Sequence, residues 1–150
     1  MAFLIKEEFK TVIRDYQLDA ITDGDDSIVD TAIEIAIEEV SSYFNASDKK
    51  VWEDGRPHYD VPAIFAAIGA QRNALMLANT KIVAIWYLLD LCNTGLEYDE
   101  AKDRYDRATA YLKALAKGDV NSATLPRLAG PPPEDELPYR FGSRNKFTHE

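Results

Sequence analysis

Acidic residues gather between Asp19 and Asp30, and their spacing is the feature of the chain that most invites metal chemistry. With Asp19 in the first position of an EF-hand loop, Asp23 takes the fifth position, Gly24 the sixth and Asp30 the twelfth. The match is incomplete, because the third position is Ile21 and the last ligand is an aspartate where a bidentate glutamate is expected. Calcium binding therefore stays an alternative interpretation of this stretch.

An acidic turn explains the same residues with fewer requirements. Gly24 accepts a positive φ, and the aspartates around it can accept hydrogen bonds from nearby amides. A carboxylate or hydroxyl at the start of a helix also caps its exposed N–H groups and favours its positive end. We predict that Asp26 or Ser27 caps the helix that begins here, and that the protein has no metal site and no cofactor.

Two further residues could do chemistry, His58 beside Asp60 and the single cysteine, Cys92. The histidine has no second His or Cys near it in the sequence, since His149 stands at the far end of the chain. One cysteine excludes a disulfide framework and a cysteine-based zinc site. The sequence contains no nucleophile–base pair, glycine-rich phosphate loop or metal-ligand spacing, so it predicts a protein that is not an enzyme.

The element that must position everything else is the apolar stretch Leu75–Cys92. A helix that is apolar on nearly every side is either the buried centre of a bundle or a membrane span. Lys81 and Asp90 interrupt the stretch, and a lysine in the middle of a membrane is costly. We expect the central helix of a small soluble domain, with no membrane partner and with Lys81 extending its stem to reach water.

Apolar residues at helical spacing predict three further helices. The pair Phe9 and Ile13 indicates a short helix over about 6–16, and the clearest apolar stripe indicates a helix over 28–44 with Glu39 outside. The last helix should follow a capping box at 94–97 and end at a glycine, residue 118. The predicted fold is all-α, a small bundle of about four helices around the central apolar helix.

The predicted core centres on two residues of that central helix, Trp86 and Leu89. We expect them to be buried against side chains from the neighbouring helices, namely Ile33, Ile37, Tyr105 and Leu112.

The formal net charge of −9 limits the possible partners. A protein that grips nucleic-acid phosphates needs clustered Lys and Arg, so such a function is disfavoured. Acidity fits simple solubility, or a surface along which DNA passes without sticking. The first residues lack the long apolar region of a signal peptide, so we expect the protein to stay in the cytoplasm where it is made.

Two irregular stretches are predicted to meet a partner. The polar loop 47–60 contains large rings, and five prolines between Pro126 and Pro138 favour an extended tail. We therefore divide the chain into a helical domain, 1–120, and a docking tail, 121–150. The tail has apolar anchors and a basic end suited to an acidic surface on a neighbour. The predicted interface residues are Trp52, Arg56, Tyr59, Leu137, Tyr139, Arg140, Phe141, Arg144, Lys146 and Phe147.

Three segments resemble one family of phage proteins: IFAAIGAQRNAL at 64–75, RYDRATAYLKALAKGDV at 104–120, and RFGSRNKF at 140–147. This is the Mu-like family of small tailed-phage and prophage proteins placed among the head–tail connectors or head-completion proteins. The chain departs from that family's pattern at Tyr111, where tryptophan is expected, and in the inserted loop at 52–60.

The resemblance implies a structural protein of the virion neck, assembled in the cytoplasm of a bacterial host. Copies of it would form a ring beneath the portal protein, usually dodecameric, and would bind the next neck or tail component. DNA would only pass through the channel of that ring. The alternative is a small intracellular helical adaptor or regulator that binds a partner protein through a groove.

Overall fold

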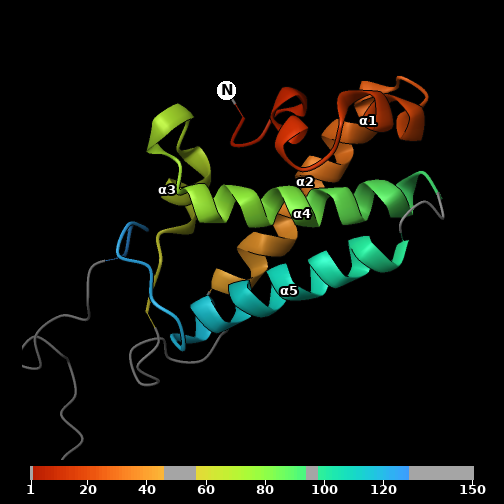
Figure 1. Ribbon diagram of the computed structural model, residues 1–150. Helices are drawn as coiled ribbons and strands as arrows, with labels where there is room; N and C mark the ends of the chain where they lie inside the picture. The colour runs from red at the N-terminus through yellow and green to blue at the C-terminus, as the bar shows by residue number, and fades with distance from the viewer. Residues whose placement is uncertain (1, 46–56, 94–97, 129–150) are drawn as a thin grey trace, which may run out of the picture.

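The computed structural model describes residues 2–45, 57–93 and 98–128, and within these ranges the fold is all-α, as predicted (Figure 1). A long helix, α4 (Ala74–Leu91), lies at the centre. Two other long helices, α2 (Asp26–Phe44) and α5 (Tyr98–Lys117), pack against it. The shorter elements are the 3₁₀ turns η1 (Lys6–Thr11) and η2 (Gly69–Gln71) and the helices α1 (Asp15–Thr22) and α3 (Val61–Ala66).

Helix α4 is apolar because two helices cover it. Asn73 caps its start by accepting the Met76 N–H at 2.8 Å. The buried Thr80 hydroxyl donates back to the Met76 carbonyl, also at 2.8 Å, so its polar atom has a partner inside the core. In the described part of the chain, α4 is the helix that is long and apolar enough to cross a membrane by length and composition. Its packing between α2 and α5 is that of a core helix.

Helices α2 and α5 each bury one face. On α2 the apolar stripe is buried as expected. The cap of this helix is Asp25, one residue before the predicted Asp26 or Ser27, and its carboxylate accepts the Ser27 N–H at 3.0 Å. Helix α5 ends at Lys117, and the next residue, Gly118, has a φ of 88°, which is strained for residues with a side chain. A Cβ at that position would also lie 2.9 Å from the Cδ of Pro57.

The N-terminal segment differs from the prediction of one helix over 6–16. It forms η1 and then α1, with a break at Val12 to Arg14 between them. Two short elements at an angle to one another let Phe9 and Leu18 both reach the core, each only 1% exposed. Of the two apolar residues used to predict this helix, Phe9 is buried in the core, and Ile13 is only partly buried against it.

The helical domain extends beyond the predicted boundary at residue 120. Leu125 is buried, and the Asp60 N–H donates to the Pro126 carbonyl at 3.0 Å. The Leu128 N–H donates to the His58 carbonyl at 2.8 Å, which completes an isolated antiparallel bridge. The domain thus reaches at least Leu128. The rest of the predicted tail, 129–150, lies outside the described residues.

The centre of the core lies one residue away from its predicted position. Leu88 is 1% exposed, whereas Leu89, although buried, borders a groove on the surface. Trp86 is half-buried and stacks on Tyr105, with ring centroids 5.1 Å apart and planes at 25°. It therefore joins α4 to α5 at the edge of the core, where an aromatic stack adds to the contact.

Candidate functional site

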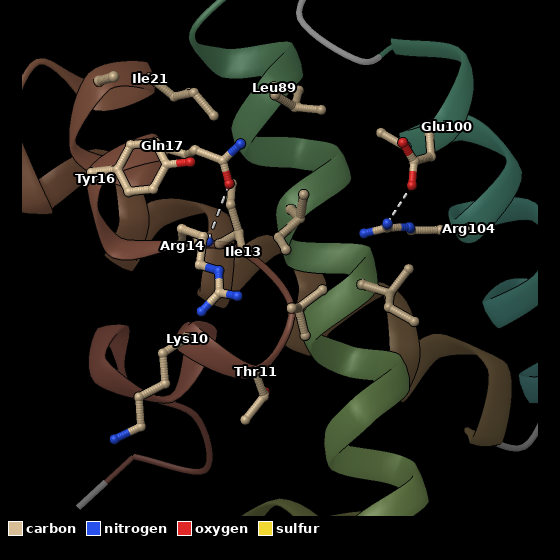
Figure 2. Close-up of a pocket in the computed structure, with 15 residues that line it drawn as sticks. Lys10, Thr11, Ile13, Arg14, Tyr16, Gln17, Ile21, Leu89, Glu100 and Arg104 are labelled. Carbon is tan, nitrogen blue, oxygen red and sulfur yellow. Dashed lines mark hydrogen bonds and ion pairs between the residues drawn. The ribbon is translucent and has the colours of Figure 1, made fainter.

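A groove of about 570 Å³ opens on the surface between the N-terminal elements and the helix pair α4–α5 (Figure 2). Helix α4 forms its floor, η1 and α1 form one wall, and the first turns of α5 form the other. The residues that border it are Lys10, Thr11, Val12, Ile13, Arg14, Tyr16, Gln17, Ala20, Ile21, Ile82, Ile85, Leu89, Glu100, Ala101 and Arg104.

The floor of the groove is apolar and its rim is basic. Ile82, Ile85 and Leu89 follow one face of α4 at helical spacing. Lys10 and Arg14 stand exposed on the N-terminal wall. Across the groove, Arg104 pairs with Glu100, so the charged residues of the lining are three basic and one acidic. On a chain with 26 acidic and 17 basic residues, the groove is a local reversal of charge.

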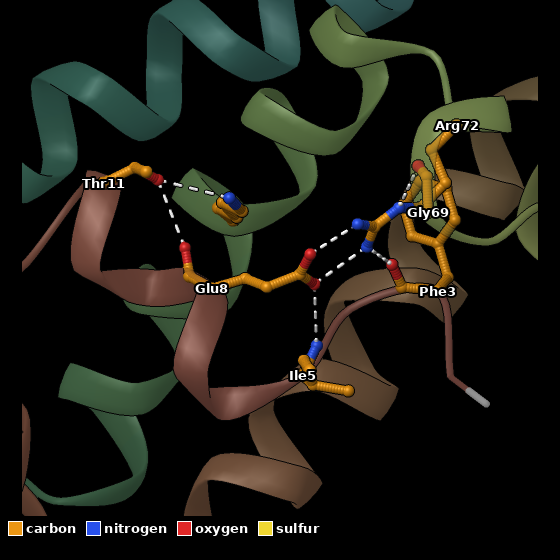
Figure 3. Close-up of polar contacts among 7 residues, drawn as sticks. Phe3, Ile5, Glu8, Thr11, Gly69 and Arg72 are labelled. Atoms are coloured by element: carbon orange, nitrogen blue, oxygen red, sulfur yellow. Dashed lines mark hydrogen bonds and ion pairs between the residues drawn. The ribbon is translucent and has the colours of Figure 1, made fainter.

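An ion pair fixes the N-terminal wall to the start of α4 (Figure 3). The Arg72 guanidinium donates to the Phe3 carbonyl at 2.6 Å and to both carboxylate oxygens of Glu8, one of them at 2.8 Å. Glu8 also accepts the Ile5 N–H at 3.2 Å. These donors, Arg72 first, hold the pKa of Glu8 below its ordinary value. A bidentate pair of this kind holds η1 in one position, and η1 forms part of one wall of the groove.

The prediction that Lys81 reaches water is wrong. Its side chain is buried beneath η1, and its Nζ donates to the Thr11 hydroxyl at 3.2 Å. Burial lowers its pKa, while the nearby Glu8 carboxylate partly offsets that shift. The stem could not extend outward because η1 covers this face of α4, and the sequence does not show which segment lies there.

Replacing Lys81 by methionine should leave the free energy of unfolding at pH 7 unchanged or raise it by about 1 kcal/mol. The reason is that the folded state carries the cost of desolvating the ammonium, and methionine fills similar space without it. Urea unfolding of the wild type and of Lys81→Met measures the difference. A loss of more than about 1 kcal/mol would mean that attraction to Glu8 outweighs desolvation.

Two carboxylates of the acidic stretch pair with a lysine of the same chain. Lys6 donates to Asp19 at 2.9 Å and to Asp26 at 2.6 Å, and these two contacts raise the pKa of the lysine. Asp25 is engaged as the cap of α2. Among the residues the structure describes, no group of three or more His, Cys, Asp or Glu side chains could hold a metal ion. In this turn, capping engages Asp25, and ion pairing engages Asp19 and Asp26.

A second polar cluster joins α2 to α5, away from the groove. The Glu39 carboxylate, predicted to lie outside, accepts hydrogen bonds from the hydroxyls of Tyr43 and Tyr105, the latter at 2.6 Å. The pKa of both tyrosines is raised, mainly by burial and secondly by the hydrogen bond to Glu39. The same two causes raise the pKa of Tyr87 to about 12. Both phenols donate to one carboxylate oxygen, Oε1, and so join α2 to α5 through Glu39.

Among the predicted interface residues, Tyr59 is the one that the structure describes, and it lies in the core. Its side chain is 3% exposed and meets the Phe44 ring edge-on, with centroids 5.6 Å apart. The Arg127 guanidinium lies over its ring at 5.7 Å. Tyr59 was predicted to face a partner, but its side chain packs within its own domain. The other predicted interface residues lie outside the described ranges: Trp52, Arg56, Leu137, Tyr139, Arg140, Phe141, Arg144, Lys146 and Phe147.

The sequence analysis missed the groove, although one signal for it was present. The apolar stretch Leu75–Cys92 has more apolar faces than α2 and α5 can cover, which leaves Ile82, Ile85 and Leu89 as a separate row. The basic rim was not visible, because Lys10, Arg14 and Arg104 come together only in the folded chain.

Comparison of the chain with protein-family models, with curated proteins and with solved structures finds no match. The groove combines an apolar floor with charges of one predominant sign.

Proposed function

We propose that this protein is a non-catalytic assembly protein, a head–tail connector that forms a ring under the portal of a tailed phage. The sequence resemblance supplies the biological setting, and the all-α fold is compatible with it. The observation that carries the proposal is the groove, because an apolar floor between charged walls is the kind of surface on which another polypeptide can dock.

The shape of the groove suits a chain segment. The row from Ile82 to Leu89 runs along α4 for about 10 Å, at about 1.5 Å per residue. Walls on both sides would exclude water from apolar side chains laid along that row. The charged residues stand at the edges of the groove, where they add specificity of partner more than affinity.

In this proposal DNA only passes through the channel, so the free protein should bind duplex DNA weakly at physiological salt. A net charge of −9 repels the phosphates, and the cations of the groove are few. Fluorescence anisotropy with a labelled duplex measures this. Submicromolar binding that weakens steeply as salt rises would contradict a passive channel.

The connector role is tested on particles of the phage whose genome encodes this chain. Mass spectrometry of purified particles should detect the protein, and cryo-electron microscopy should place it in a ring between the portal and the tail. Absence from particles would contradict the proposal. In that case, a soluble complex with one cellular protein would support the adaptor or regulator instead.

A further inference from the structure

We propose that the groove binds the segment Glu134–Phe141, of sequence EDELPYRF, from a neighbouring copy of the same chain. This inference rests on the proposed function, since it describes how copies in the assembly would join. The groove belongs to the described fold, and the segment lies in the part of the chain beyond it. Charge and apolar spacing each support this occupant.

The charges of the groove and of the segment are opposite. Lys10 and Arg14 stand exposed on the N-terminal wall without a carboxylate of the lining beside them, because Glu100 is engaged by Arg104 on the other wall. The segment begins with Glu-Asp-Glu at 134–136, the one run of three consecutive acidic residues in the sequence. A groove with a basic rim attracts negative charge, and this run has more consecutive carboxylates than any other stretch of the sequence.

The apolar residues of the segment match the floor in spacing. Leu137, Tyr139 and Phe141 alternate with Pro138 and Arg140. In an extended chain, alternate side chains share one face, and residues 137 to 141 span about 13 Å. The apolar row of α4 offers about 10 Å, so two or three of these side chains can lie along it. Arg140 would then point away from the basic rim.

The last described residue, Leu128, lies toward the start of α4, away from the middle of the groove floor. The described chain ends at Leu128, close to the start of α4, where the Asn73 amide donates to Thr124 at 2.6 Å. The middle of the groove floor, Ile85, lies about 18 Å further along α4. The segment and the groove are different parts of identical subunits, so a segment of one copy bound in the groove of the next makes a heterologous contact. Such contacts generate rings when the rotation closes.

The test places a photo-crosslinking benzoylphenylalanine at position 139 of the full chain. Equal amounts of ¹⁵N-labelled and unlabelled protein are mixed, irradiated and analysed by mass spectrometry. We expect cross-links from position 139 to groove residues such as Ile13, Ile85 or Leu89, in peptide pairs that combine the two isotopes. The matched control carries the same probe at Phe147, which should not cross-link to the groove.

Charge reversal gives a second, independent measurement. The double variant Lys10→Glu/Arg14→Glu should reduce self-association in sedimentation velocity by about five- to thirtyfold. Adding Glu134→Lys/Glu136→Lys to the same chain should restore it. Both wall positions are exposed, so the fold should survive, and the circular dichroism spectrum verifies this.

The outcomes separate this inference from the connector role. Cross-links within one chain only, or to surfaces outside the groove, would overturn the inference, and so would reversed charges that leave self-association unchanged. The protein would remain a connector if it were still found at the neck of particles. Conversely, groove cross-links in a protein that is absent from particles would support the contact and refute the connector role.

Discussion

Leu88→Ala should lower the free energy of unfolding by about 2–5 kcal/mol, the largest effect expected of a single substitution in this chain. Leu88 is 1% exposed and lies in the cluster that α4 forms with α2 and α5. Removing its branched end leaves a cavity that the surrounding helices fill only in part. Urea unfolding followed by circular dichroism measures the change.

Leu89→Ala is the matched control, with the same chemistry at the next position. Leu89 borders the open groove, so water can enter part of the space it leaves, and its loss should fall at or below the lower end of that range. A larger loss from Leu89→Ala than from Leu88→Ala would contradict the position assigned to the core.

Arg72→Met should be the second most destabilising change, with an expected loss of about 1–3 kcal/mol. The substitution keeps the apolar length of the side chain but removes the donors to Glu8 and to the Phe3 carbonyl. Both charged side chains are largely sheltered from solvent, at 13% and 22% exposure, so water replaces the lost donors incompletely. Thermal unfolding at pH 7 measures the loss. An unchanged melting temperature would show that η1 is held by its apolar residues alone.

The same ion pair should make stability depend on acid. The pKa of Glu8 is lowered in the folded state, so at pH values between the folded pKa and the ordinary value of 4.5 the unfolded chain binds more protons. The stabilisation is fully present above 4.5 and is lost as pH falls through the folded pKa. Glu8→Gln should remove this part of the acid dependence and leave the slope above pH 4.5 unaltered. A steeper acid loss in Glu8→Gln would contradict it.

The sequence predicted the three long helices because each carries its own periodic signal. The stripe of α2 and the continuous apolar run of α4 depend only on residues a few positions apart. Capping residues follow the same local logic, and the start of α2 was predicted to within two residues of Asp25. Local patterns of this kind determine which residues face the core, but not which distant segments pack against them.

Residues whose environment depends on a distant segment were predicted less well. Lys81 was expected at the surface, and η1, about 70 residues earlier in the chain, buries it. Glu39 looked like an exposed charge on α2, and Tyr105 from α5 draws it into a hydrogen bond between helices. The groove belongs to the same class, since its walls come from both ends of the described chain.

The antiparallel bridge between Tyr59 and Arg127 decides how the fold would carry mechanical tension. A pull on the chain beyond Leu128 would first load the two backbone hydrogen bonds to His58 and Asp60. Asp60 caps α3, and Tyr59 packs on Phe44 at the end of α2, so the force would pass into two other helices. Helix α5 would then be shielded from unwinding at its C-terminal end, because the load would enter the domain at the bridge.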